Sequence, residues 1–315
     1  MAYTVLEVEA TQQVTRSITA FDQYENASAL NQRFAFTLFW EERSNGVNLC
    51  KIDVGGRVHV LGLRTEKLTA VFDKHYTDQQ AAQQALEFST RELQMCQRLN
   101  IAAQVNRVPN IVIRIFEELR AQGVMDYYTV IGTHALYAYE AAAGVTFDQA
   151  STATNDVDLL WHVENRVKFV RDMKVAGLTM VKLLQRVDPS FERNEEQLES
   201  AMNATGFSVD FLRRQEPNDA RDAFSITGVE GDVHPVQAVK SYIFRNSPKF
   251  EQVIIGDDGN MTRMRTVDPK TFVDFKLWMS QQPTREMLKR NRDERQAKAV
   301  QQLLDEGFLQ SALKL

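Results

Sequence analysis

The segment that most constrains the fold of this chain is residues 154–161 (TNDVDLLW), in which one residue separates Asp156 from Asp158. Residues i and i+2 of a β-strand point to the same side, so a strand here directs both carboxylates to one point. The apolar residues that alternate with them would point into a core: Val157, Leu159 and Trp161. Neighbouring carboxylates repel each other, and a cation between them removes the repulsion. Mg²⁺ prefers oxygen ligands, often one or two carboxylates together with substrate phosphates. The pattern therefore indicates a metal site for phosphoryl transfer, with a solvated loop as the alternative.

A strand-turn-helix pattern precedes the two aspartates. Residues 127–131 (YYTVI) are aromatic or β-branched, Gly132 and Thr133 follow, and residues 135–143 are rich in alanine. Glycine lets the backbone approach a ligand without a Cβ in the way. The N–H groups at the start of a helix favour an anion such as a phosphate. Thr133 is therefore either a structural N-cap or part of a phosphate-binding turn.

A third aspartate lies in a later strand pattern, residues 206–212 (GFSVDFL). Apolar residues alternate along this segment, and Asp210 falls on the face opposite to the aromatic ones. An unpaired charge on such a strand is costly. If the Asp-x-Asp strand is its neighbour, Asp210 completes a cluster of three carboxylates. The alternative is an ion pair with Arg213 or Arg214.

These three segments, in this order, resemble the polymerase-β-type nucleotidyltransferase superfamily. More narrowly, residues 130–139 (VIGTHALYAY) and 154–158 (TNDVD) are similar to a bacterial branch with a Gly-Thr-His-Ala turn and a Thr-x-Asp-Val-Asp strand. The specific match covers about residues 120–165, and a looser match continues to the C-terminus. Two features depart from the superfamily. Thr133 stands where Ser or Gly is usual, and residues 144–154 form an inserted loop that lengthens the interval to Asp156.

The resemblance implies a metal-dependent enzyme that transfers a nucleoside monophosphate from a nucleoside triphosphate (NTP) to a hydroxyl acceptor and releases pyrophosphate. It implies two Mg²⁺ ions and an NTP as the donor substrate. The residues that it implies for catalysis and metal binding are Asp156, Asp158 and Asp210. Those implied for contact with the triphosphate are Gly132, Thr133 and Lys276. Two alternatives stay open: a catalytically weak nucleotide-binding regulatory module, and a toxin-like nucleotidyltransferase that acts on RNA or protein.

Bulk properties narrow the partners. The net charge of −5 argues against strong nonspecific affinity for nucleic acid, because such affinity needs many neutralised phosphates. A small-molecule or protein acceptor is therefore favoured over RNA, and no DNA partner is expected. No apolar run reaches the length of a membrane span, and the N-terminus lacks a signal-like apolar core, so we expect no membrane partner and a cytoplasmic location. The two cysteines and five histidines show no metal-ligand spacing, and only His134, next to the Gly-Thr turn, merits testing.

The chain organisation predicts an α+β fold: a mixed sheet of nucleotidyltransferase type with flanking helices, a small N-terminal antiparallel sheet and a C-terminal helical part. We place the boundaries at residues 1–105, 106–267 and 268–315. Strand-like runs at 34–40, 47–52 and 57–61 form the small sheet, between helices at 12–32 and 78–103. Further helices are predicted at 109–122, 166–186 and 195–203, and a hairpin at 250–267.

Basic residues in the C-terminal part have two interpretations. Arg285 and Lys289 are four apart, and a helix starting near residue 284 would place them on one solvated face. In the resembling family, basic residues after the catalytic sheet can instead face the triphosphate. Lys276 is the best candidate for that role, because it lies among aromatic residues rather than in a run of charges.

Overall fold

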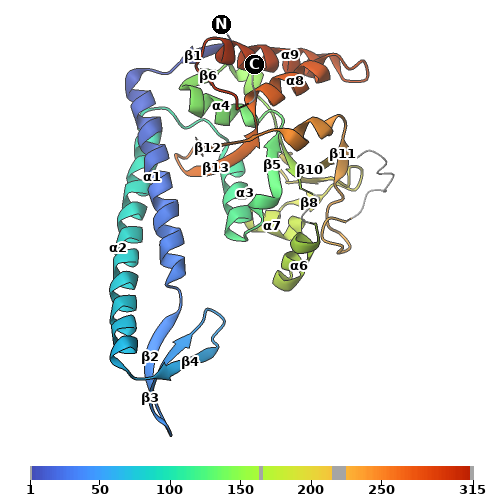
Figure 1. The fold of residues 1–315 in the computed structure, drawn as a ribbon. Helices are drawn as coiled ribbons and strands as arrows, with labels where there is room; N and C mark the ends of the chain where they lie inside the picture. The colour runs from blue at the N-terminus through green and yellow to red at the C-terminus, as the bar shows by residue number, and fades with distance from the viewer. Residues whose placement is uncertain (1, 163–165, 215–224, 313–315) are drawn as a thin grey trace. The chain divides into compact units, whose positions relative to one another are not determined.

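We describe a computed structural model of the chain, covering residues 2–162, 166–214 and 225–312. The described chain divides into two compact units, one formed by Thr15–Ala102 and the other by Met1–Val14 together with Ala103–Leu315. The fold class is the predicted one: an α+β architecture with a mixed sheet and flanking helices, a small antiparallel sheet, and a helical C-terminal part (Figure 1). None of the helices within the described ranges combines the length and the apolar character that crossing a bilayer requires.

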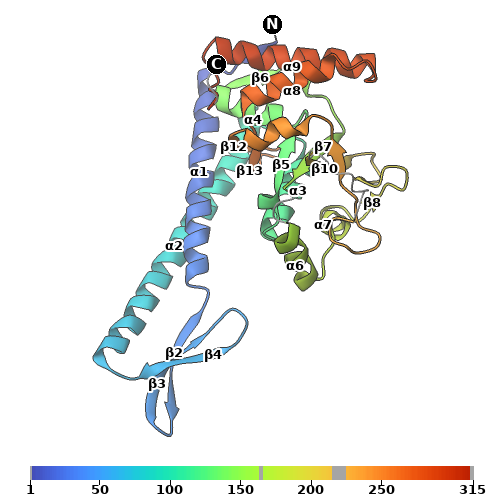
Figure 2. The same cartoon turned by 45° about the vertical axis from the view of Figure 1, so that its right-hand side comes forward.

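The Thr15–Ala102 unit consists of a helical pair with a small sheet at one end (Figure 2). It contains most of α1 (Val8–Arg33), α2 (Glu66–Ala102) and the antiparallel strands β2 (Thr37–Arg43), β3 (Gly46–Ile52) and β4 (Val58–Leu63), in the order β2-β3-β4. The small sheet is held to α2 by the Trp40–Phe72 ring contact (5.5 Å) and by the hydroxyl of Tyr76, which donates to the carbonyl of Leu38. The predicted three-strand sheet is confirmed, and α2 begins earlier than predicted.

The other unit contains a mixed sheet, and within the described residues this sheet has eight strands. Their spatial order is β12 (Lys249–Ile255), β13 (Met261–Val267), β5 (Tyr128–Ile131), β7 (Asp156–Trp161), β10 (Ser208–Arg214), β9 (Ser200–Met202) and β8 (Glu192–Arg193), and β11 (Val236–Ala238) also pairs with β10. Strand β7 is antiparallel to β5 and parallel to β10. The segments that carry the candidate residues are therefore direct neighbours at the centre of the sheet.

Helices pack on both faces of this sheet. The helices of the unit are α3 (Asn110–Ala121), α4 (Ala135–Ala143), α5 (Gln149–Thr152), α6 (Arg166–Ala176), α7 (Met180–Val187), α8 (Pro269–Ser280) and α9 (Met287–Asp305), with 3-10 turns η1 (Met125–Tyr127) and η3 (Ser241–Asn246). Val157, Leu159 and Trp161 are fully buried in a core with residues of α3, α6 and α7, as their alternation predicts. Leu160 belongs to a second core with residues of α4, α8 and α9. Asp156 and Asp158 share the strand face of Leu160, so they point toward this second layer.

Three local predictions need correction. The helix predicted at 166–186 is interrupted at Gly177, which has φ +65°, and α7 restarts after Thr179, whose hydroxyl accepts from the N–H of Lys182. The helix predicted at 195–203 does not form. The side chain of Asn194 accepts from two backbone N–H groups in a turn, and β9 then pairs with β10. The loop predicted at 144–154 contains α5 and a short strand, β6 (Val145–Phe147), which pairs with β1 (Tyr3–Val5).

Candidate active site

Three carboxylates converge at the centre of the sheet. Strands β7 and β10 pair in a register that sets Asp158 directly beside Asp210, and Asp156 lies two residues earlier on the same face. Within the described residues, ligand oxygens of Asp156, Asp158 and Asp210 all lie within 4.8 Å of one another. The structure thus brings together the three aspartates that the sequence singled out. The guanidinium of Arg213, the alternative partner of Asp210, donates to the carbonyl of Pro235 (3.2 Å).

Gly132 lies against this cluster at the end of β5. Ile131 pairs with Asp158, so the chain turns immediately beside the carboxylate. Gly132 has φ +73°, and a Cβ at this position would overlap Oδ2 of Asp158 and lie 3.0 Å from its Cγ. Glycine is therefore needed here both for the left-handed backbone conformation and for the close approach of the turn to Asp158.

Thr133 and His134 are both buried behind the turn. The hydroxyl of Thr133 accepts a hydrogen bond from Nε2 of Gln296 on α9 (3.1 Å). It does not cap α4, because the N-cap residue is His134 and no side-chain cap bond forms there. Burial lowers the pKa of His134 to about 4, so its ring is neutral at neutral pH, and it packs against the rings of Tyr137 and Phe207. His134 is thus a packing residue rather than a ligand.

The electrostatics of the cluster favour a cation. The pKa of Asp158 is raised to about 7, mainly by burial and also by the negative charges of Asp156 and Asp210, against the opposing effect of Lys276 and Arg285. Burial also raises the pKa of Asp210, while the hydroxyls of Ser200 and Ser208 oppose the shift. For Asp158 and Asp210, these shifts indicate that the site disfavours the ionised carboxylates, a cost that a cation bound between them would offset. An all-carboxylate donor set of this kind fits a hard divalent cation such as Mg²⁺.

A cleft of about 460 Å³ opens beside Asp158. It is lined by Gly132 and Asp158 on the sheet side and by Phe275, Lys276 and Trp278 of α8 on the other. This volume lies within the ~300–1,000 Å³ range typical of small-molecule sites, and apolar and aromatic side chains with a few polar groups are the usual lining. The cleft is therefore the place where a ligand could contact both the acidic cluster and the glycine turn.

Lys276 lies in the wall of this cleft as part of an ion-pair network. Its Nζ donates to Oδ1 of Asp293 on α9 (2.8 Å), and Oδ2 of Asp293 accepts from Nε of Arg285 (2.5 Å). Burial lowers the pKa of Lys276, while Asp293 and Asp158 oppose that shift. Arg285 itself lies in the connection before α9, so the prediction that it shares a helix face with Lys289 was wrong. Arg285 instead contacts the buried Asp293 and gives this carboxylate a second cationic partner.

Helix α9 contacts the site at three further points that the sequence did not reveal. Nε2 of Gln296 donates both to the Thr133 hydroxyl and to the carbonyl of Ser151 (2.7 Å), and Arg292 donates to the carbonyl of Ala153 (3.1 Å). These bonds connect α9 to the turn and to the segment that leads into β7. Only a weak indication of these contacts was present in the sequence. Asp293 and Gln296 are three residues apart and so share one helix face, but nothing in the sequence marks that face as buried.

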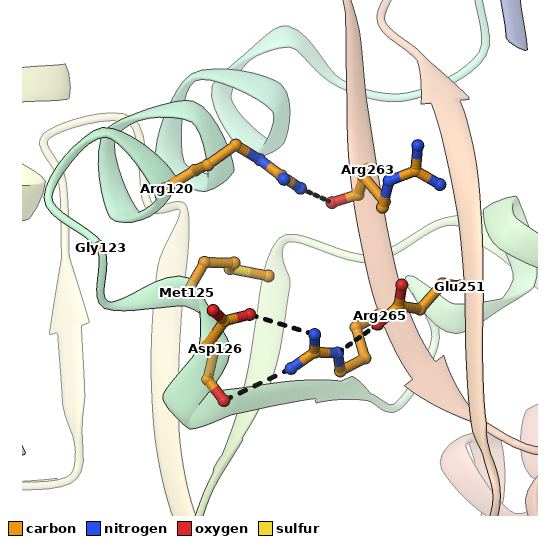
Figure 3. A pocket seen from close by; sticks show the side chains of 7 residues that line it. All are labelled: Arg120, Gly123, Met125, Asp126, Glu251, Arg263 and Arg265. Atoms are coloured by element: carbon orange, nitrogen blue, oxygen red, sulfur yellow. Dashed lines mark hydrogen bonds and ion pairs between the residues drawn. The ribbon is translucent and has the colours of Figure 1, made fainter. Parts of the chain in front are cut away.

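A smaller cavity of about 90 Å³ lies at the other end of β5 (Figure 3). Its charged side chains are engaged by protein groups. Arg265 pairs with Asp126 (3.1 Å) and with Glu251 (2.6 Å), and Arg120 donates to the carbonyl of Arg263 (2.9 Å). Its volume is well below the ~300 Å³ at which ligand sites begin. The cleft at Asp158 is therefore the stronger candidate for the functional site.

Comparison with known families agrees with this geometry. A family model described as Nucleotidyltransferase matches residues 110–315, which is more than half of the chain. The protein therefore belongs to this nucleotidyltransferase family. No significant match to a curated protein or to a solved structure was found.

Proposed function

We propose that this protein transfers a nucleoside monophosphate from an NTP to a hydroxyl acceptor in a metal-dependent reaction that releases pyrophosphate. The observation that carries the proposal is the convergence of Asp156, Asp158 and Asp210, in which Asp158 lies against the Gly132 turn and lines a cleft of about 460 Å³. Membership of a nucleotidyltransferase family supports the reaction class.

The residues divide into two groups in this proposal. Asp156 and Asp158 would hold two Mg²⁺ ions, and Asp210 would complete the ligand set on the acceptor side. When bound, the ions would neutralise charge on the phosphates and lower the pKa of the acceptor hydroxyl. The turn at Gly132 and Thr133 would contact the triphosphate through backbone N–H groups, because the Thr133 side chain is buried against Gln296.

The remaining contribution of the chain is orientation. The strand register fixes Asp158 beside Asp210, and Gly132 lets the turn approach Asp158 closely. In the proposed reaction, the turn would hold the donor next to Asp158. A new bond forms between the acceptor oxygen and the α-phosphorus, and the bond from that phosphorus to the bridging oxygen of the β-phosphate breaks. Lys276, which lines the cleft, would stabilise the negative charge of the phosphates electrostatically.

The direct test is the double variant Asp156→Ala/Asp158→Ala, incubated with labelled NTP, Mg²⁺ and cell lysate as the source of acceptor. We expect transfer of label to fall to background, because the carboxylates that would hold the ions are gone. A matched control removes two exposed carboxylates elsewhere, Asp73→Ala/Asp305→Ala, and should transfer at the wild-type rate. Wild-type transfer by the Asp156/Asp158 double variant would refute the mechanism.

The same assay addresses the donor and the acceptor. Separate incubations with each of the four labelled NTPs identify the donor base, and the size of the labelled product distinguishes a small molecule from a protein or RNA. The acidic net charge of −5 favours a small-molecule or protein acceptor over RNA.

A further inference from the structure

The ion-pair network behind the cleft contains more positive than negative charge. Asp293 is fully buried, and its two oxygens bind two different cations, Lys276 and Arg285. The Lys276 side chain is 5% exposed and that of Arg285 is 24% exposed. One carboxylate therefore holds two cationic groups, and both cations also line the cleft with Asp158.

Such a surplus needs an explanation, because burying charge is costly unless it is compensated. An exchange of either cation for an apolar residue would leave a simple buried pair. Two cations on one carboxylate instead present a net positive wall to the cleft, which an anionic ligand would neutralise. The negatively charged Asp158 also lines this cleft. A ligand that brings both phosphates and divalent cations would complement the two basic residues with its phosphates and Asp158 with its cations.

Arg285 binds Asp293 through Nε. The two Nη groups of a guanidinium carry further N–H donors, and such donors suit a phosphate. The connection that bears Arg285 is itself held in place. The N–H of Arg285 donates to the carbonyl of Gln282 (3.2 Å), Nε2 of Gln282 donates to the carbonyl of Trp278 (2.9 Å), and Arg290 donates to the carbonyl of Ser280 (2.8 Å).

We propose that Lys276 and Arg285 form a phosphate clamp for the polyphosphate of the donor, and that Asp293 is the positioning residue that holds both cations toward the cleft. This inference deepens the proposed function and rests on it for the identity of the ligand. Its new assignments are Arg285 and Asp293. A side chain fixed before binding loses less conformational freedom on binding, so the clamp strengthens affinity without new contacts.

The test uses inorganic tripolyphosphate with Mg²⁺ as the probe, which measures the clamp without base or ribose. Isothermal titration calorimetry compares the wild type with Arg285→Ala and with Lys289→Ala. Lys289 is an exposed lysine nearby that pairs loosely with Glu286 (3.7 Å), so its variant controls for the loss of one positive charge. We expect Arg285→Ala to weaken binding by at least about tenfold, as loss of charge-assisted hydrogen bonds to phosphate requires, and Lys289→Ala to stay within about twofold.

A double-mutant cycle separates positioning from simple stability. Asp293→Asn should weaken tripolyphosphate binding in the wild-type background and much less in the Arg285→Ala background, because the residue acts through the clamp. Equal effects in both backgrounds would overturn the role of Asp293. Arg285→Ala keeps the Lys276–Asp293 pair and so remains informative even if Asp293→Asn fails to fold.

The outcomes for the clamp and for the proposed function are distinct. Wild-type protein that does not bind tripolyphosphate, or an Arg285→Ala variant equal to Lys289→Ala, would overturn the clamp even if nucleotide transfer depends on Asp156 and Asp158. Arg285-dependent binding without any nucleotide transfer would support the clamp and count against the transfer reaction.

Discussion

Replacement of Gly132 by alanine gives the sharpest test of the site geometry. The added Cβ would overlap Oδ2 of Asp158, so the carboxylate or the turn must move. Gly123 offers a matched control on the same chain. It has φ +67°, close to the +73° of Gly132, but no heavy atom lies within 4 Å of a Cβ placed there. The two alanine variants therefore share the backbone cost and differ in the steric one.

The magnitudes follow from this comparison. An alanine in the left-handed region costs roughly 1–2 kcal/mol, and this cost applies to both variants. Displacing Asp158 from its rotamer adds about 0.5–1.5 kcal/mol for Gly132→Ala alone. The effect on activity is larger, because a shift of about 1 Å in a catalytic constellation costs on the order of 100-fold. We therefore expect Gly132→Ala to lose about 100-fold in nucleotide transfer and Gly123→Ala to lose almost none.

The assay combines thermal unfolding of both variants with initial rates of label transfer, measured well below the lower melting temperature. Both variants should be destabilised by a similar backbone cost, with the additional loss confined to Gly132→Ala. Equal activity in the two alanine variants would refute the view that the turn must approach Asp158 closely.

Further predictions concern pH, α9 and the core. The folded-state pKa of Asp158 is raised to about 7 from 3.8, so protonation of this group favours folding of the metal-free protein. The contribution is fully present at pH below 4 and is lost as the pH rises through 7. The melting temperature in EDTA should therefore be lower at pH 8 than at pH 5, and Asp158→Asn should reduce this difference. Because the cation requires the ionised carboxylate, stabilisation by added Mg²⁺ should be greater at pH 8 than at pH 6 in the same melts, and an equal effect would contradict the assignment. Gln296→Leu removes a donor to two buried acceptors and should cost about 1–3 kcal/mol in urea unfolding. Gln301→Ala removes an exposed hydrogen bond to Asp305 and should stay within about 0.5 kcal/mol. Phe211→Ala empties a fully buried position and should cost about 3–5 kcal/mol by the same measurement; a loss below 1 kcal/mol would show that the core collapses to fill the site.

The central part of the site could be predicted because it depends on local patterns. Alternation along residues 154–161 places Asp156 and Asp158 on one face and the core residues on the other, and the same rule orients Asp210. Periodicity alone does not say that the strand with Asp210 lies next to the strand with Asp156 and Asp158. That prediction came from the family resemblance. The register that pairs Asp158 with Asp210 then follows from burial of the apolar face of each strand.

The parts that escaped prediction depend on distant contacts. Residues 200–202 read as helical alone, but pairing with β10 makes them a strand. Gln296 acquires its role only by reaching Thr133, which is 163 positions away, and Asp293 acquires its role only by burial between two cations. Local sequence carries little information on either, since tertiary packing overrides intrinsic propensity.

The bond between Gln296 and Thr133 also has a consequence for biosynthesis. The ribosome makes the aspartate-bearing strands well before it makes α9, so a nascent chain holds the acidic residues while the helix that braces the turn is still missing. The growing polypeptide therefore gains the bond that braces the turn beside Asp158 only after α9 has emerged and docked.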